Sequence, residues 1–213
     1  MRNIFSKTRG DQSAPAPTQP VTIVSGLPRS GTSMMMKILA AGGIAPLTDE
    51  LRAADKDNPK GYFEFERVKQ LDKGDVAWLP QARGKAVKVI SFLLQYLPPD
   101  ETYKVVFLRR NLEEILASQR KMIVHRGEDP DQMDDEAVAA MFTRHIELVE
   151  QWLSRRPNVE TLYIHYSDVM TEPSGQIARI IHFLDRPLDE TAMTQVVDPH
   201  LYRNRQVTAA AAV

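Results

Sequence analysis

The sequence predicts a three-layer α/β/α fold with a central parallel sheet. Four short stretches are rich in apolar or β-branched residues, and helical patterns separate them. We expect these stretches to be strands, at 21–24, 86–90, 104–108 and 161–166. Their apolar residues are nearly continuous, which is typical of strands that are buried on both faces. Strands that alternate with helices along a chain favour a parallel sheet with helices on both sides.

The first expected strand, 21–24, leads into the sequence GLPRSGTS at 26–33 and then into a helix from about 32 to 41. The two glycines at 42–43 end that helix, because glycine readily adopts the backbone conformation that closes a helix. The order is therefore strand, glycine-containing loop, helix.

The second half of the chain carries three further sets of helix signals. After the strand at 104–108, Asn111 is placed to cap a helix on which Leu112, Ile115, Leu116 and Gln119 share one face. A polar, turn-rich segment at 126–135 precedes an amphipathic helix that Pro157 stops near Arg156. Helices are also expected at 173–185, with a proline in the first turn, and at 188–197, capped by Asp189.

Composition limits the classes of function that the chain can have. With 213 residues, of which 43% are hydrophobic, it is long enough for one globular domain with a substantial core. The net charge of −1 gives no bulk reason to expect nucleic acid or an anionic membrane as partner. There is no cysteine, so disulfides and thiolate metal sites are excluded, and the composition suits a reducing, cytoplasmic location.

The sequence also predicts where the domain begins and ends. The first 20 residues contain three prolines among polar residues and no apolar signal core, so we expect a disordered arm at 1–20. The domain is expected at 21–205 and a flexible tail at 206–213. No apolar run approaches the roughly 18 residues that span a bilayer, so no membrane span is expected.

The loop at 26–33 has the outline of a phosphate-binding loop. Gly26 and Gly31 are five residues apart, as in the GxxxxGK[ST] loop of nucleotide triphosphatases, so the predicted fold is P-loop NTPase-like. Backbone N–H groups at such a turn, together with the helix N-terminus, bind phosphate or sulfate. Here Thr32 takes the place of the lysine, and the positive side chain is Arg29. No carboxylate for magnesium ends the next strand, so the loop predicts a site for a metal-free anion.

In four segments the chain resembles the sulfotransferase family that uses 3′-phosphoadenosine 5′-phosphosulfate (PAPS). The segments occur in the family's order: AVKVISFLLQYLP follows PRSGTS, and VVFLRRNLEEILAS precedes LYIHYSDVMTEPSGQIARIIHFLD. They lie at 28–33, 86–98, 105–118 and 162–185. The loop by itself is of moderate specificity, but its order with the segment at 105–118 makes the prediction strong.

The resemblance implies a donor site built from several segments. The loop at 28–33 resembles the family's 5′-phosphosulfate loop, which makes Arg29, Ser30, Gly31, Thr32 and Ser33 candidate contacts. Arg110 and Ser118 match the positions that bind the 3′-phosphate. Arg110 follows a strand at its carboxyl end, where ligands of open α/β sheets bind. The resemblance further implies that Tyr166 contacts adenine and that Arg203 belongs to a late basic segment closing the donor pocket.

The resemblance also assigns roles in catalysis. Lys88 matches a lysine near the transferred sulfuryl group, and we expect Arg29 to neutralise charge on the leaving oxygen. In the family's small-molecule branch a histidine lies two residues after that lysine and acts as the base. Here Ile90 holds that position, and isoleucine cannot accept a proton. Either another residue is the base or the acceptor binds differently.

Other branches of the family use a glutamate as the base, and Glu64 is the best candidate, expected at the start of a helix on the acceptor side of the sheet. Glu66 is the alternative. Both acids could instead only cap and solvate that helix, since acids favour first turns. His165 or His125 could be the base only if the fold brings it to Lys88.

These residues predict a sulfotransferase that moves a sulfuryl group from PAPS to a hydroxyl or amine by metal-free in-line displacement, leaving 3′-phosphoadenosine 5′-phosphate (PAP). The acceptor would be a small molecule, a glycan or a peptide. Two alternatives remain: a P-loop kinase of a small metabolite, which the missing lysine disfavours, and a non-catalytic nucleotide-binding relative, which the loss of histidine at Ile90 leaves open.

Overall fold

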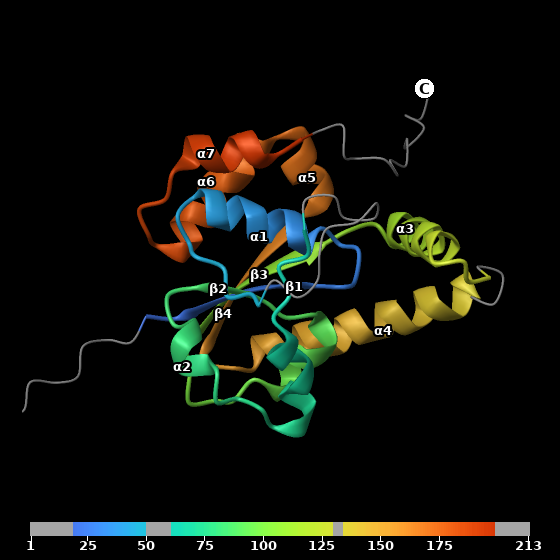
Figure 1. The fold of residues 1–213 in the computed structure, drawn as a ribbon, viewed down its shortest axis with the longest axis horizontal. Helices are drawn as coiled ribbons and strands as arrows, with labels where there is room; N and C mark the ends of the chain where they lie inside the picture. Colours follow the sequence, from blue (N-terminus) through green and yellow to red (C-terminus); the bar gives the residue numbers. More distant parts are fainter. Residues whose placement is uncertain (1–18, 50–60, 130–133, 199–213) are drawn as a thin grey trace, which may run out of the picture.

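The computed structural model describes residues 19–49, 61–129 and 134–198. Its centre is a parallel sheet of four strands in the order β2-β1-β3-β4 (Figure 1). The strands are β1 (Val21–Gly26), β2 (Ala86–Lys88), β3 (Tyr103–Arg109) and β4 (Val159–His165). The predicted fold class is confirmed, and the carboxyl ends of the strands meet at one edge of the sheet.

Two strands end earlier than predicted, at positions that matter for the site. β2 ends at Lys88, opposite Val24, and the chain turns at Ile90 into the short 3₁₀ helix η2 (Ser91–Tyr96). β4 ends at His165, so Tyr166 begins α5 (Tyr166–Thr171) instead of ending the strand. Val89 and Ile90 after β2 and the aromatic Tyr166 after β4 are residues that favour strands, which is why the sequence pattern extended each strand too far.

Four helices cover one face of the sheet: α1 (Thr32–Ala41), α5, α6 (Pro173–Leu184) and α7 (Glu190–Val196). Alternate residues of the strands point into this layer, where Val24, Val106, Leu108 and Ile164 pack with Met35 and Met36 of α1 and with Ile177 and Ile180 of α6. Met35 and Met36, two of the three methionines of α1, are completely buried, so this face of the helix forms core.

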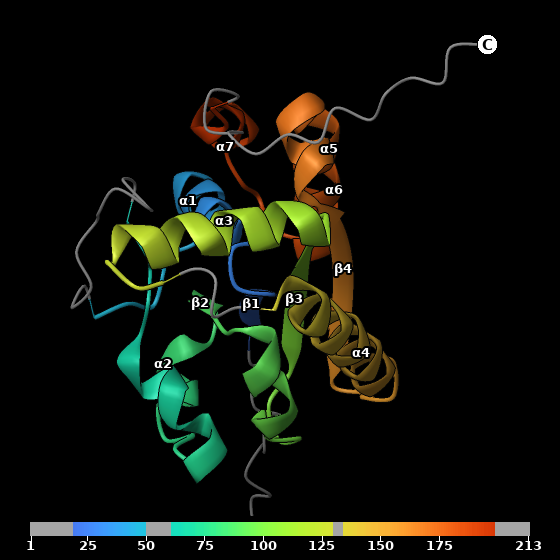
Figure 2. The same cartoon turned by 90° about the vertical axis from the view of Figure 1, so that its right-hand side faces the viewer.

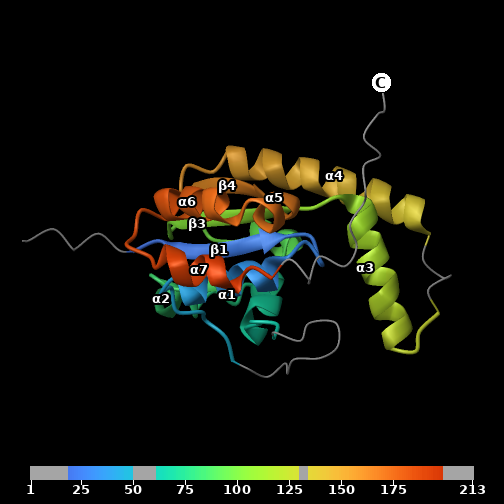
Figure 3. The ribbon, with the colours of Figure 1, turned by 90° about the horizontal axis from the view of Figure 1, so that it is seen from above.

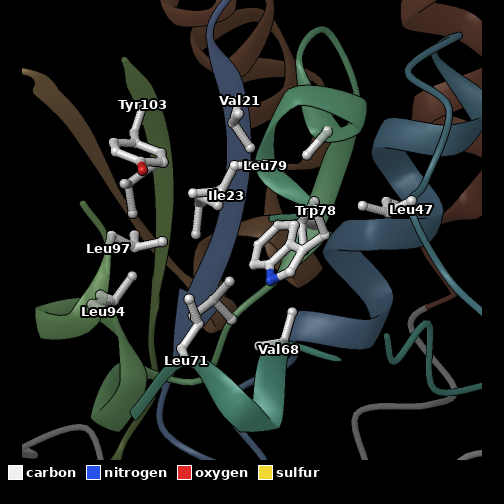
Figure 4. Packing of buried hydrophobic residues seen from close by; sticks show 14 of the residues in the cluster. Val21, Ile23, Leu47, Val68, Leu71, Trp78, Leu79, Leu94, Leu97 and Tyr103 are labelled. Carbon is white, nitrogen blue, oxygen red and sulfur yellow. The ribbon is translucent and has the colours of Figure 1, made fainter. Parts of the chain in front are cut away.

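The other face is covered by η1 (Glu66–Lys73), α2 (Leu79–Ala82), η2 and α4 (Asp135–Ser154). Trp78 is completely buried there against Ile23, Leu71 and Leu79 (Figure 4). Its indole N–H donates to the carbonyl of Asp75 at 2.9 Å, so its polar atom is satisfied. The remaining helix, α3 (Leu112–His125), lies beyond the carboxyl end of β1 and runs on towards α4 (Figures 2 and 3).

Both predicted helix caps, Asn111 and Asp189, are confirmed, and Asp134 provides a third that was not predicted. Asn111 accepts the backbone N–H groups of Glu113 and Glu114. Asp189 caps α7 in the same way, and α4 is capped by Asp134. Within the described residues, no helix combines the length and apolar character that crossing a bilayer requires.

Ile23 lies on a central strand and is completely buried, so removing its side chain should strongly destabilise the sheet. We expect Ile23→Ala to lower the free energy of unfolding by about 2–5 kcal/mol, the usual cost of emptying a core site. The control is Leu148→Ala on α4, where the side chain is 54% exposed and the change should cost less than about 0.5 kcal/mol. Urea denaturation measures both. Equal losses would contradict the placement of Ile23 in the core.

Candidate functional site

The loop between β1 and α1 has the backbone of an anion-binding turn. Gly26 and Gly31 have φ of 149° and 103°, and Arg29 itself has a φ of 69°, in the left-handed region. Gly31 is the N-cap of α1, and no side chain caps the first turn of that helix. The hydroxyl of Ser30 is buried and has no hydrogen-bond partner among the described residues. The loop therefore offers polar groups that a bound anion can satisfy.

Arg29 joins this loop to the segment that follows β3. Its Nε donates to Oγ of Ser118, on α3, at 2.9 Å. Its backbone carbonyl accepts a hydrogen bond from a guanidinium nitrogen of Arg110 at 3.1 Å. The structure thus brings Arg29, Arg110 and Ser118 together, although 89 positions separate Arg29 from Ser118.

Arg110 is held by a carboxylate and by an aromatic ring. Its Nε donates to Glu114 at 2.9 Å, and the side chains of the pair are 9% and 4% exposed. Its guanidinium lies over the ring of Tyr166, 4.2 Å from the centroid. Burial raises the pKa of the Tyr166 hydroxyl, an effect that the charge of Arg110 partly offsets. Tyr166 is therefore a neutral, buried ring that packs against the guanidinium of Arg110.

The ring of Tyr166 also lies against the anion loop. A Cβ on Gly31 would come within 2.5 Å of the ring, closer than any real contact. The sequence suggested a glycine here only for its loop geometry, but the structure gives it a second reason, the close approach of Tyr166. Residue 31 must lack a side chain on both grounds.

The second part of the site is centred on Lys88, at the end of β2. Its ammonium donates to the backbone carbonyl of Tyr62, and it lies 3.4 Å from Oγ of Ser33 and 3.6 Å from Oε1 of Glu64. The hydroxyl of Ser33 bonds to the same Tyr62 carbonyl at 3.3 Å. Lys88 is only 8% exposed, so these contacts fix its position. They connect β2, the anion loop and the segment 61–65.

Glu64 lies between two ammonium groups. One of its carboxylate oxygens faces Lys88, and the other lies 3.5 Å from Lys69, with the Glu64 side chain 17% exposed. Glu66 is 42% exposed and pairs with Lys69 at 2.6 Å. Of the two predicted candidates for the base, Glu64 forms an ion pair with Lys88, whereas Glu66 pairs with Lys69.

The local structure around Glu64 differs from the prediction. Residues 61–65 are not helical, and the expected helix begins only at Glu66, as the 3₁₀ helix η1. Phe65 is extended and packs edge-on against Trp78, with ring centroids 5.7 Å apart, which keeps the chain out of the helix up to that point. A capping role in the first turn therefore fits Glu66 and does not fit Glu64.

The structure removes both histidine alternatives for the base. His165 ends β4, and two strands separate β4 from β2, which amounts to roughly 14 Å at the usual strand spacing. His125 is the last residue of α3, four turns from the start of that helix near the loop. The predicted contact of Arg203 lies outside the described residues.

Several residues around the site were not predicted. Glu114, the partner of Arg110, was available from its i,i+4 spacing on the helix. His145 on α4 bonds through Nε2 to Oγ of buried Ser91 at 2.9 Å and stacks on Phe92 at 3.7 Å. Burial lowers the pKa of His145. The carbonyl of Tyr62 left no signal in the sequence, because a backbone atom is common to every residue.

Comparison with known proteins decides the family. The model of the family described as "Sulfotransferase domain" matches residues 19–210. The chain belongs to the sulfotransferase domain family. Among curated sulfotransferases, it is 24% identical over 194 residues to sulfotransferase 1A1 of Mus musculus, covering 82% of this chain and 63% of that protein. It is 26% identical over 108 residues to sulfotransferase 1A1 of Rattus norvegicus, covering 46% of this chain and 36% of that protein. The chain thus spans less than two thirds of these relatives.

Solved sulfotransferase structures share the fold. The Mycobacterium tuberculosis sulfotransferase STF1 matches with a TM-score of 0.54 and 16% identity, over 87% of this chain and 72% of STF1. The sulfotransferase domain of the Synechococcus PCC 7002 olefin synthase matches with a TM-score of 0.52 and 16% identity, over 91% of this chain and 86% of that domain. Mouse sulfotransferase SULT7A1, solved as a complex with PAP, matches with a TM-score of 0.52 and 15% identity, over 83% of this chain and 62% of SULT7A1.

Gly31 allows a sharp test of the anion loop, because Gly43 has the same φ of 103° and nothing within 4 Å of its added Cβ. Gly43→Ala should lose only about 1–2 kcal/mol of stability, the cost of a left-handed alanine. Gly31→Ala should lose that amount and also displace Tyr166, so PAP binding should fall at least about tenfold in Gly31→Ala alone. Isothermal titration calorimetry with PAP measures binding, and thermal unfolding measures stability. Equal PAP affinity in the two variants would contradict a nucleotide site beside Gly31.

Proposed function

We propose that the chain is a PAPS-dependent sulfotransferase that transfers a sulfuryl group to a hydroxyl or amine. The observation that carries the proposal is the contact between the anion loop and Lys88, whose ammonium lies 3.4 Å from Oγ of Ser33. This contact places the buried ammonium of Lys88 beside Ser33, at the end of the loop. Arg110 and Tyr166 contact the loop nearer its middle, at Arg29 and Gly31. A nucleotide that carries a negative group at each end fits this arrangement of charges.

The donor would be held by two groups of residues. The loop residues Ser30, Gly31, Thr32 and Ser33 would bind the 5′-phosphosulfate, for which the unpartnered hydroxyl of Ser30 and the uncapped first turn of α1 are suited. Arg110 and Ser118 would bind the 3′-phosphate, and Tyr166 would contact the adenine. The Arg110–Glu114 pair keeps the guanidinium in one orientation. Arg29 joins the two groups, through its side chain to Ser118 and through its carbonyl to Arg110.

Sulfuryl transfer resembles phosphoryl transfer, in which the protein contributes positioning and charge stabilisation more than covalent chemistry. The acceptor oxygen would form a bond to sulfur as the bond from sulfur to the bridging oxygen breaks, and the electron pair of that bond would leave with PAP. Lys88 would orient the sulfuryl oxygens. Arg29 would stabilise charge on the leaving oxygen through the terminal nitrogens of its guanidinium, while its Nε donates to Ser118.

Glu64 is the residue that we propose as the general base. It is the carboxylate that pairs with Lys88, and it lies in the non-helical segment 61–65 beside the Tyr62 carbonyl that Lys88 and Ser33 share. The acceptor's proton would pass to the Glu64 carboxylate as the oxygen attacks. The exposed ammonium of Lys69, 3.5 Å away, would keep that carboxylate oriented.

Two other readings are weaker. A P-loop kinase would use a lysine in the loop, where this chain has Thr32. A non-catalytic nucleotide-binding relative would lack a base, whereas Glu64 pairs with Lys88. Thermal unfolding with PAP, with PAPS, or with ATP and magnesium separates the readings, because a ligand stabilises the fold that binds it. Stabilisation by ATP and magnesium alone would overturn the proposal. Binding of PAP and PAPS without turnover of PAPS by any acceptor would favour the non-catalytic reading.

Arg110 should discriminate nucleotides that carry a 3′-phosphate from those that do not. Because Arg110→Gln alone would leave the buried Glu114 unpaired, the comparison uses the Glu114→Gln background. Adding Arg110→Gln to that background should weaken PAP binding by about 10- to 100-fold, the usual cost of a charge-assisted contact. Binding of adenosine 5′-phosphate, which has no 3′-phosphate, should hardly change. Calorimetry measures both affinities, and equal losses would show that Arg110 does not bind that phosphate.

Glu64→Gln keeps the shape of the side chain and removes its basicity. We expect turnover of PAPS with a panel of phenols and alcohols to fall by roughly 10²- to 10⁴-fold, while PAP affinity stays near that of the unchanged protein. Glu66→Gln is the matched control, because Glu66 pairs with the same Lys69, whereas the ion pair with Lys88 belongs to Glu64. Loss of turnover in Glu66→Gln with Glu64→Gln unaffected would assign the base to Glu66. If neither change matters but Lys88→Ala abolishes transfer, the acceptor arrives already acidic, as a phenol can.

A further inference from the structure

Phe63 has a backbone conformation that phenylalanine rarely adopts. Its φ is 51°, in the left-handed region, and it is one of three non-glycine residues with positive φ among those that the structure describes. A bulky residue pays about 1–2 kcal/mol there. Such strain persists only where surrounding contacts enforce it, and it is concentrated at functional sites. The other outlier in the site is Arg29, in the anion loop.

The chain on the carboxyl side of Phe63 is firmly anchored. The carbonyl of Glu64 accepts the hydroxyl of Thr48 at 2.8 Å and the backbone N–H of Asp49 at 3.3 Å. The backbone N–H of Glu66 donates to the carboxylate of Asp49 at 2.6 Å. Phe65 packs edge-on against the buried Trp78. These contacts fix residues 64–66 without help from Phe63.

On the amino side of Phe63, Tyr62 is held by hydrogen bonds to Lys88 and Ser33. Its carbonyl accepts from Lys88 and from Ser33, its side chain is 6% exposed, and the Lys88 ammonium lies 5.8 Å from its ring centroid. Phe63 is therefore the joint between two fixed pieces of chain, and its φ sets the direction of the Tyr62 carbonyl relative to Glu64.

We propose that Phe63 is a positioning residue whose left-handed backbone aims the Tyr62 carbonyl and the Glu64 carboxylate at the ammonium of Lys88 together. The proposal deepens, and rests on, the proposed sulfuryl transfer. In this proposal the backbone angle φ of residue 63, rather than its aromatic ring, keeps the Lys88 ammonium in place.

The geometry of the joint supports this. Returning φ from 51° to the usual value near −60° is a rotation of about 110° about the N–Cα bond of residue 63. With residues 64–66 anchored, that rotation swings the Tyr62 carbonyl away from Lys88. Lys88 would then keep Glu64 and lose the carbonyl that it shares with Ser33. The ammonium would no longer be fixed between the anion loop and the base.

The ring of Phe63 has a separate and smaller role. It packs at the edge of the core formed by α1 and its neighbours. Packing there explains why an apolar side chain is tolerated at a position where glycine would relieve the strain. A test must therefore separate the loss of the ring from the change in backbone preference.

Phe63→Asn and Phe63→Thr form a matched pair for this purpose. Both remove the ring and introduce a small polar side chain, so their losses of packing are similar. Asparagine adopts the left-handed region readily, whereas a β-branched residue such as threonine does not. We expect kcat for PAPS turnover to be on the order of 10- to 100-fold lower in Phe63→Thr than in Phe63→Asn. PAP affinity should be alike in both, because PAP lacks the sulfuryl group.

A second measurement does not depend on turnover. The rate of reductive methylation of Lys88 by formaldehyde and a borohydride, followed by mass spectrometry, reports how firmly the ammonium is held. It should be several-fold faster in Phe63→Thr than in Phe63→Asn. Lys104, at the amino end of β3 and 16% exposed, is the internal control and should react equally in both. If Phe63→Thr does not fold, Phe63→Ala and Phe63→Gly replace the pair, with alanine expected to behave as threonine.

The outcomes separate this proposal from the proposed function. If the labelling of Lys88 differs as expected but no variant and no unchanged protein turns over PAPS, the positioning role stands and the sulfuryl transfer fails. If PAPS is turned over but Phe63→Asn and Phe63→Thr agree in kcat and in Lys88 labelling, the positioning role is wrong. A loss of kcat of the same size in both variants would assign the effect to the ring.

Discussion

The site depends on the way in which Arg29 ties the anion loop to α3. The loop follows β1, whereas Ser118 and Arg110 follow β3, and Arg29 contacts one with its side chain and the other with its carbonyl. Adjacent strands of a parallel sheet bring these segments to the same edge. The left-handed backbone of Arg29 then directs the two groups of one residue to different partners. Together with Tyr166, which packs against both Gly31 and Arg110, these contacts hold the two halves of the proposed nucleotide site relative to each other.

Two cations of the site, Arg110 and Lys88, are each paired with a carboxylate. Arg110 is paired with Glu114 while both are almost completely buried, and Lys88 is paired with Glu64. Burying an unpaired charge costs far more than a paired one, so these carboxylates allow cations to lie in a sheltered site. The same sheltering strengthens their attraction for an anion. The acids beside the cations therefore serve the fold as well as the proposed chemistry.

Much of this arrangement could be predicted from the sequence, but some of it depends on tertiary contacts that the sequence pattern does not reveal. The strand, loop and helix around Gly31, and the positions of Lys88 and Arg110 at strand ends, were readable because local patterns determine them. The order β2-β1-β3-β4 was not, and that order is what separates His165 from Lys88. Tyr166 was placed one element too early because an aromatic residue next to a run of strand-forming residues favours a strand, whereas it begins α5. The φ of Phe63 contradicts the preference of the residue itself and only tertiary contacts impose it.

The replacement of the expected histidine by Ile90 has a structural counterpart. Ile90 is 38% exposed at the turn from β2 into η2, and the next residue, Ser91, is buried and bonded to His145. The segment after Lys88 is therefore held from the α4 side, while the polar partners of Lys88 come from residues 61–65 and from Ser33. A side chain at position 90 that cannot take a proton leaves Glu64 as the basic group beside Lys88 among the described contacts. In the proposed mechanism a carboxylate from one segment works with an ammonium from another. The backbone geometry that holds these segments together would then be part of the catalytic arrangement, and that is the role proposed for Phe63.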